Sequence, residues 1–177
     1  MTVRLAMVKR TDLIQEIQNI PWFVDLKPAQ VERLATIAGI REVPQGELLF
    51  REGDREDFMY VILEGQVNLQ SYVPSHGFLY IYTADPLDIL GWSSMTPIVR
   101  QRTASGCAVT PVRLLTFDSI PLRRMCDEDH DLGYLIMKRL ANVVASQYLV
   151  NRLALYDMII KNNQEQPALP CQPPEQK

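Results

Sequence analysis

Five residues in the middle of the chain have the types and the spacing to bind an anion. They are Gly91, Ser93 and Ser94, followed by Arg102 and Thr103. A glycine lets a ligand approach the backbone closely, and the peptide N–H groups of a short turn attract negative charge. A guanidinium a few residues later can pair with a phosphate or a carboxylate. The segment therefore predicts a short anion-binding turn.

The same segment also has structural interpretations. Arg102 could be a surface arginine, and Ser93 and Ser94 could simply cap a short helix. We expect Trp92 and Ala104 in the pocket wall, with Trp92 as a core or lid aromatic rather than a platform for a base. The separation between the arginine and the glycine motif favours the ligand-binding interpretation.

The residues that would support catalysis or metal binding are not arranged for either. His76 and His130 are far apart in sequence and cannot supply the ligand cluster of a cupin-like metal site. The sequence has no G-x-S-x-G nucleophile elbow, and Cys107 is interpreted as a small core residue. The cysteines show no CxxC spacing, so we expect reduced thiols. We predict a protein that is not an enzyme and holds no metal or resident cofactor.

The charge and hydropathy of the sequence argue against nucleic-acid and membrane partners. The formal net charge of −3 gives no sign of the basic patch that polyanion-binding proteins usually carry. No apolar run approaches the roughly 20 residues that span a bilayer, and residues 1–10 lack the apolar block of a signal peptide. We therefore expect a soluble, cytoplasmic protein without a membrane partner.

Short strands follow two predicted helices. Thr11 and Asp12 are expected to cap a helix over 11–19, and a second helix starts at Pro28 and ends at Gly39. Alternating and β-branched segments predict six strands, the last two forming a hairpin: 47–51, 58–63, 66–72, 78–83, 104–109 and 112–117. This pattern predicts an α+β fold built on a small antiparallel β-barrel or jelly roll.

The last third of the chain is predicted to be helical. Asp118 and Ser119 cap a short helix, and a long helix follows over 131–163. One stripe along it steps by 4, 3, 4, 3, 4, as in a coiled-coil seam: Ile136, Leu140, Val143, Gln147, Val150 and Ala154. A second stripe is predicted to touch the barrel: Leu149, Leu153, Tyr156 and Ile160. The predicted divisions are an N-terminal extension, a barrel domain, the long helix and a disordered Pro- and Gln-rich tail: 1–10, 11–130, 131–163 and 164–177.

Two leading helices, a small barrel with a glycine-led anion turn and a long helix resemble the cyclic nucleotide-binding domain of the Crp/Fnr regulators. The resemblance covers roughly residues 21–160, and three motifs carry it: Gly46 with Glu52-Gly53-Asp54, Tyr60-Val-Ile-Leu-Glu-Gly65-Gln-Val, and Gly91 with Arg102-Thr103-Ala104. It implies an effector phosphate on the cassette N–H groups, Arg102 and Thr103. It also implies that the long helix pairs with a second copy through residues 131–161 and places Ser146, Gln147 and Tyr148 near the effector's base. Gln147 also has a simpler interpretation, as a polar residue that fixes the register of a coiled coil.

The sequence departs from the family pattern at two places. Trp92 stands where the family has a glutamate that binds the ribose 2′-hydroxyl, and losing such a hydrogen bond weakens binding about 10- to 100-fold. Only 16 residues follow Lys161, which leaves no room for the family's helix-turn-helix. Direct DNA binding is therefore not expected.

Two hypotheses remain open. In the first, the chain is a ligand-sensing regulatory module that binds a cyclic nucleotide or another small anionic effector and signals through the helix of a homodimer. In the second, the domain is degenerate and binds no effector. It would then serve as a dimeric scaffold that uses its helix or its Pro-rich tail to bind a protein partner.

Overall fold

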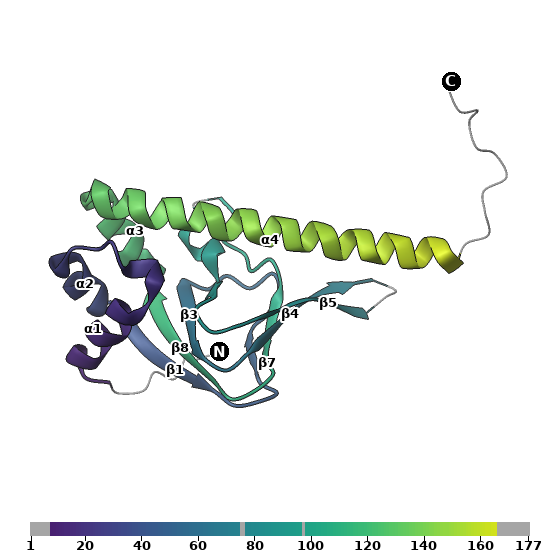
Figure 1. Cartoon of the computed structure of the whole chain (residues 1–177), viewed down its shortest axis with the longest axis horizontal. Coiled ribbons are helices and arrows are strands. Elements are labelled where there is room, and N and C mark those ends of the chain that lie inside the picture. The colour runs from purple at the N-terminus through teal and green to yellow at the C-terminus, as the bar shows by residue number, and fades with distance from the viewer. Residues whose placement is uncertain (1–7, 75–76, 97, 166–177) are drawn as a thin grey trace, which may run out of the picture.

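Two antiparallel sheets enclose the barrel beneath a long helix (Figure 1). The computed structural model describes residues 8–74, 77–96 and 98–165. The first sheet has the strand order β1-β8-β3-β6: Ala38–Val43, Val112–Asp118, Phe58–Glu64 and Ile89–Leu90. The second has the order β2-β7-β4-β5: Leu48–Phe50, Ser105–Ala108, Val67–Val73 and Gly77–Ala84. The predicted jelly roll is confirmed.

Strand β3 separates two hydrophobic cores. Its residues alternate, so Tyr60 and Ile62 face the barrel interior while Met59 and Val61 face the helices. The four side chains are fully buried. A strand buried on both faces reads as a continuous apolar run, which is how residues 58–63 appear in the sequence.

The hairpin predicted for 104–109 and 112–117 is wrong. Strand β7 pairs with β2 and β4, whereas β8 pairs with β1 and β3, so the two strands lie in different sheets. The connection at Thr110 and Pro111 crosses from one sheet to the other and packs against Gly65. Turn residues indicate that the chain reverses, but they do not indicate which strand it will pair with next.

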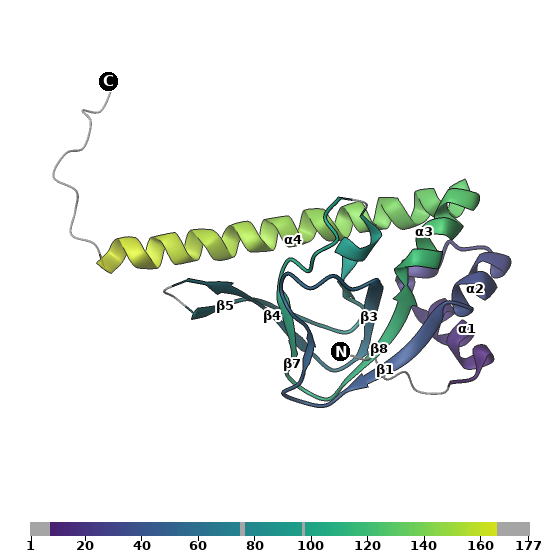
Figure 2. The same cartoon turned by 180° about the vertical axis from the view of Figure 1, so that it is seen from behind.

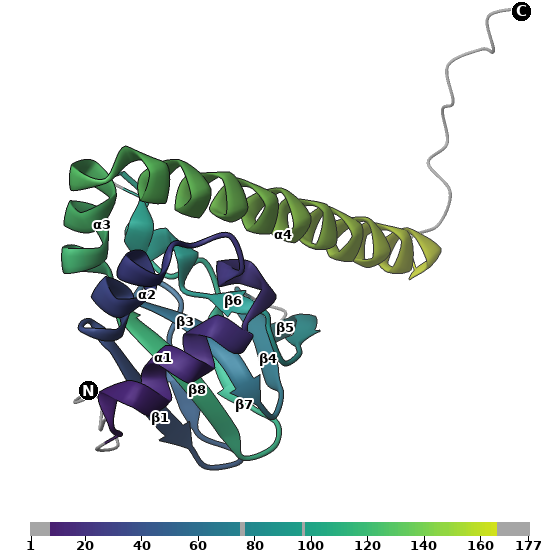
Figure 3. The same cartoon turned by 60° about the vertical axis from the view of Figure 1, so that its left-hand side comes forward.

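The helices cover the outer face of the first sheet (Figure 3). In chain order they are α1 Arg10–Asn19, the 3-10 turn η1 Pro21–Phe23, α2 Pro28–Ala35, the 3-10 turn η2 Trp92–Met95, α3 Ser119–Glu128 and α4 His130–Glu165. Pro28 does start α2, and Asp118 does cap α3, accepting a 3.0 Å hydrogen bond from the Ile120 amide.

Three predicted boundaries are wrong. Helix α1 begins at Arg10 with Lys9 in the cap position and no side-chain cap, so Thr11 and Asp12 lie inside it. Helix α2 ends at Ala35 rather than Gly39, because β1 begins at Ala38 and pairs with β8. Residues 164 and 165 belong to α4, not to a disordered tail. The rest of the predicted tail, most of the predicted N-terminal extension and His76 lie outside the described residues.

Helix α4 lies across the sheets, and its last turns extend past them (Figures 1 and 2). Ile136 and Leu140, predicted to face a second copy, are buried in this chain's own helical core. The stripe predicted to touch the barrel is exposed: Leu149 at 57%, Leu153 at 63%, Tyr156 at 44% and Ile160 at 56%. The N-terminal part of the first stripe therefore packs on this chain's own helices, and the second stripe does not pack on the barrel. No helix among the described residues is long and apolar enough to span a membrane.

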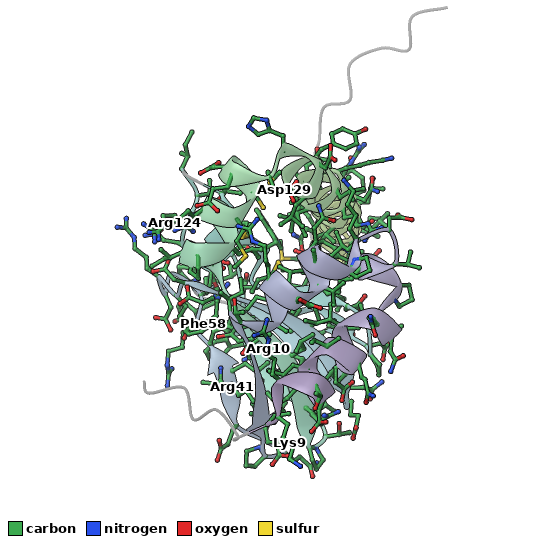
Figure 4. The ribbon with its side chains drawn as sticks, turned by 90° about the vertical axis from the view of Figure 1, so that its left-hand side faces the viewer. Lys9, Arg10, Arg41, Phe58, Arg124 and Asp129 are labelled. Carbon is green, nitrogen blue, oxygen red and sulfur yellow. The ribbon has the colours of Figure 1, made fainter. Side chains whose placement is uncertain are left out.

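Polar pairs tie α2 to the junction of α3 and α4, where Figure 4 labels Asp129. Lys27 Nζ lies 2.9 Å from Asp131, and Arg33 Nη2 lies 2.7 Å from Glu128. Gln30 donates a 2.9 Å hydrogen bond to Asp129 and, with the Leu132 amide, lowers the pKa of that carboxyl. These contacts fix the first turn of α4 to the helical end of the domain.

We expect Gly65→Ala to destabilise the domain by about 3 kcal/mol, because its φ of +84° is strained for alanine and the new Cβ would lie 2.2 Å from the Pro111 carbonyl oxygen. The matched control is Gly53→Ala, which has the same strain (φ +83°) but no atom within 4 Å of the Cβ. We expect it to lose only about 1 kcal/mol. Urea unfolding followed by circular dichroism measures both, and equal losses would contradict the account of the sheet crossing.

Candidate ligand site at Arg102

Gly91 sets the geometry of the site. It follows β6, has a φ of +70° and begins η2. A Cβ at this position would lie 2.1 Å from Arg102 Nη1 and 2.8 Å from the Phe58 carbonyl oxygen. Glycine is required here twice over, for the left-handed backbone and for the close approach of the guanidinium.

Arg102 is buried, with 3% of its surface exposed, so the surface-arginine interpretation is wrong. Its Nη2 donates a 2.7 Å hydrogen bond to the Phe58 carbonyl oxygen and lies 3.3 Å from Glu56 Oε2. The guanidinium carbon lies 4.9 Å from the centre of the Phe50 ring and 5.4 Å from that of Tyr60. Both distances suit cation–π contacts. Nε and Nη1 are buried without a hydrogen-bond partner among the described residues.

The turn at Gly53 and Asp54 holds the arginine in place. The Arg102 amide donates to the Asp54 carbonyl over 2.8 Å, and the Gly53 amide donates to the Arg102 carbonyl over 2.9 Å. Two motifs that are far apart in sequence are therefore hydrogen-bonded to each other. A second cation nearby in sequence, Arg100, pairs with Asp57 and does not line the hollow at Arg102.

The predicted anion-binding residues divide into two groups. Gly91, Ser93, Arg102 and Thr103 line one hollow, together with the predicted wall residues Trp92 and Ala104. Ser94 is fully buried, and its hydroxyl lies 2.8 Å from the Gly91 carbonyl oxygen and 2.6 Å from the Ser119 hydroxyl. The Ser94 side chain thus joins η2 to α3.

The three residues predicted to lie near the effector's base, Ser146, Gln147 and Tyr148, line different spaces. Gln147 bridges the domain, since its Oε1 accepts a 2.6 Å hydrogen bond from Trp92 Nε1 and its Nε2 donates a 3.1 Å bond to the Tyr82 hydroxyl. Ser146 lines a cleft on one flank of α4, and Tyr148 lines a groove on the other. Gln147 therefore faces its own barrel and not a coiled-coil seam.

The spaces around Gln147 differ greatly in size. The hollow at Arg102 has a volume of about 20 Å³, which is room for about one water. Gln147 also lines a cleft of about 620 Å³ between α4, η1 and the turn before β6. That volume is in the range of small-molecule sites. The hydrogen-bonded chain from Trp92 through Gln147 to Tyr82 stands between the two spaces.

Sequence reasoning missed several residues of the site. Phe50 and Tyr60 flank the guanidinium, Glu56 pairs with it, and Tyr82 ends the hydrogen-bonded chain. The apolar run 58–63 marks a strand buried on both faces but does not show which of its faces carries Tyr60 into the barrel. Cys107, predicted to be a core residue, is only partly buried.

Comparison with known proteins assigns the fold to a family. The sequence model of the cyclic nucleotide-binding domain matches residues 40–129, which is half of the chain. The chain belongs to the cyclic nucleotide-binding domain family. The match contains the cassette at Gly91 and both sheets apart from the first two residues of β1.

Relatives in this family include regulators. The chain is 24% identical over 119 residues to a CRP-like cAMP-activated global transcriptional regulator of Mycobacterium tuberculosis, a match that covers 67% of this chain and 53% of the regulator. It is 32% identical over 82 residues to an uncharacterized NTE family protein of the same species, covering 46% of this chain and 14% of that protein. The chain therefore spans about half or less of the length of these relatives.

Solved structures share the fold. A cyclic nucleotide-binding domain from Methylobacillus flagellatus superposes with a TM-score of 0.67 at 24% identity and covers 86% of this chain and 83% of its own. The sensor domain of the transcriptional regulator DNR from Pseudomonas aeruginosa gives 0.65 at 18% identity, with 78% and 93% covered.

The hydroxyl of Tyr82 provides a pH test of its buried position. Burial, with the negative charge of Asp88, raises its pKa to about 12 from the ordinary 10.0. The folded state favours the neutral phenol, so its contribution to stability is complete below pH 10 and is lost as the pH rises from 10 to 12. In a spectrophotometric titration of the native protein, we expect the difference between the wild type and Tyr82→Phe to show one ionisation near pH 12. A difference centred near pH 10 would contradict the buried position.

Proposed function

We propose that the chain is a non-catalytic, ligand-sensing regulatory module that binds a small anionic effector at Arg102, with a cyclic nucleotide as the first candidate. The observation that carries this proposal is the buried guanidinium of Arg102, which lines a hollow and has two nitrogens, Nε and Nη1, without hydrogen-bond partners among the described residues. Burying donors without acceptors is costly, and an anionic ligand would satisfy them. Membership of the cyclic nucleotide-binding family supports the class of effector.

The effector needs more room than the hollow offers. A nucleotide cannot fit in about 20 Å³, so binding requires the wall formed by Trp92, Gln147 and Tyr82 to open. The anionic group would then lie on Arg102, and the rest of the effector would extend past Gln147 into the cleft of about 620 Å³. Because Gln147 belongs to α4, opening the wall frees that helix from η2. A ligand that favours the open state shifts the population of the helix positions.

We expect Arg102→Met to weaken cAMP binding about 10- to 100-fold, because a charge-assisted hydrogen bond to the anionic group is lost. Isothermal titration calorimetry with cAMP and cGMP measures this, and circular dichroism checks that the variant is folded. The matched control is Arg100→Met, which removes a guanidinium of the same loop that pairs with Asp57. Binding that survives Arg102→Met unchanged would rule out this site.

The proposal includes a homodimer formed through α4. The helix has a third stripe, on a side different from the two predicted above. It steps by 4, 3, 4, 3, 4, 3: Met137, Ala141, Val144, Tyr148, Asn151, Leu155 and Met158. Met137 and Leu155 are each 48% exposed and Tyr148 is 64% exposed. An apolar groove of about 480 Å³ runs beside this stripe, with Trp92 and Thr96 as its other wall.

The length of α4 supports the same dimer. Its 36 residues span about 54 Å. Among the described residues, no other helix or strand lies beside its last turns (Figure 3), where Ile159 and Ile160 are 44% and 56% exposed. Helices with exposed apolar stripes are marginal in water unless a partner buries the stripe. A second copy of α4, lying parallel and in register, would place Asn151 opposite its equivalent, where the two amides can hydrogen-bond to each other.

We expect Leu155→Glu to dissociate the dimer, raising its dissociation constant at least about tenfold through the buried charge. The matched control is Leu153→Glu, which puts the same charge on an exposed leucine roughly 200° away around the helix. Sedimentation equilibrium at micromolar concentration distinguishes the two variants. A monomeric wild type, or dissociation by the control alone, would contradict this seam.

A second function is favoured by one observation, the small volume of the hollow at Arg102. With Trp92 closing it, the domain would be a dimeric scaffold that binds a protein partner and no effector. Calorimetry without heat for cAMP, cGMP or other phosphorylated metabolites, together with a stable dimer, would favour this function over the first.

A further inference from the structure

The arginine proposed to bind the effector already carries an anion of the protein. Glu56 Oε2 lies 3.3 Å from Arg102 Nη2, and the same oxygen accepts a 3.0 Å hydrogen bond from the Tyr60 hydroxyl. Glu56 precedes β3 and is partly buried. Its carboxylate lies on Nη2, the one nitrogen of the guanidinium that has partners.

The buried charges around Glu56 do not balance. Arg41 of β1, which Figure 4 labels, is 7% exposed, donates a 3.1 Å hydrogen bond to the Leu49 carbonyl and contacts the Tyr60 hydroxyl at 3.5 Å. It has no ion pair among the described residues. Two buried guanidinium groups thus share one carboxylate through Tyr60. The cluster therefore keeps a net positive charge with Glu56 in place, which attracts an anion.

The two partners of the ion pair differ in their freedom to move. The side chain of Arg102 is 1% exposed and is held by Phe58, Phe50 and Tyr60. The side chain of Glu56 is 19% exposed, so its carboxylate can reach water by rotating about its own bonds. An incoming anion cannot share Arg102 with Glu56 at close range, because two like charges repel strongly in a buried site. The carboxylate is the group that must leave.

We infer that Glu56 is a built-in competitor for the effector: its carboxylate occupies Arg102 in the empty state, and an anionic effector must displace it to bind. Glu56 thereby sets the effector concentration at which the module responds. It also keeps the buried guanidinium paired when no effector is present. The inference rests on the proposed function, since it concerns the same arginine.

The experiment compares Glu56→Gln with the wild type by calorimetry, using cAMP and cGMP as the probes. Glutamine keeps the shape and the hydrogen bond from Tyr60 but removes the charge, so we expect the dissociation constant to fall about tenfold or more. The matched control is Glu64→Gln, the same change at a 70%-exposed carboxylate on β3, and we expect no change in affinity. Glu56→Asp keeps the charge and withdraws it by one methylene, so a gain of about two- to fivefold is expected. It provides the test if Glu56→Gln does not fold.

Each outcome either supports or overturns the competitor role of Glu56. Tighter binding by Glu56→Gln, or binding by this variant where the wild type shows none, supports the competitor. Equal or weaker binding by both Glu56 variants, with a wild type that binds, overturns the competitor and leaves the effector site standing. No binding by the wild type or by any folded variant overturns both the competitor and the proposed function.

Discussion

A guanidinium buried among aromatic rings is the constraint around which the rest of the site is organised. Removing Arg102 from water is expensive, and the protein offsets that cost with a carbonyl oxygen, a carboxylate and the faces of Phe50 and Tyr60. The same requirement fixes Gly91, whose missing side chain makes room for the charged group. It also fixes the turn at Gly53, which is hydrogen-bonded to the arginine's own backbone. Three segments of the chain are therefore held together by one residue, through its side chain and its backbone.

The site and the long helix are physically joined through Gln147. Trp92 belongs to the cassette turn that also carries Gly91, and its indole N–H is bonded to the helix. Gln147 continues the contact to Tyr82 on the second sheet. A tryptophan at this place supplies a donor and bulk, so the turn contacts the helix directly without a ligand between them. The state described here is thus one in which helix and cassette are locked to each other.

Much of the fold could be predicted from the sequence, because it depends on local patterns. Alternating residues marked the strands, and Asp118 and Pro28 marked helix starts that the structure confirms. Contacts between distant segments could not be predicted in this way. The chain at Thr110 has the residues of a hairpin turn, yet the closure of two sheets sends β8 to a different neighbour. A helix with three apolar stripes does not reveal which of them its own barrel buries, so Ile136 and Leu140 were assigned to the wrong partner. Glu56 stands in a run of charged residues, and only the folded chain shows which carboxylate turns inward.

The polar row between α2 and the start of α4 gives the long helix the mechanics of a lever. Lys27 holds Asp131 in its first turn, and Gln30 and Arg33 hold Asp129 and Glu128 just before it, so we treat that end as the pivot. Gln147 lies about 24 Å from the pivot along the helix axis and the last helical residue, Glu165, about 51 Å from it. A sideways shift at Gln147 is therefore roughly doubled at the far tip. A movement of ångström size beside the barrel would therefore become a larger displacement of any partner bound to the last turns of α4.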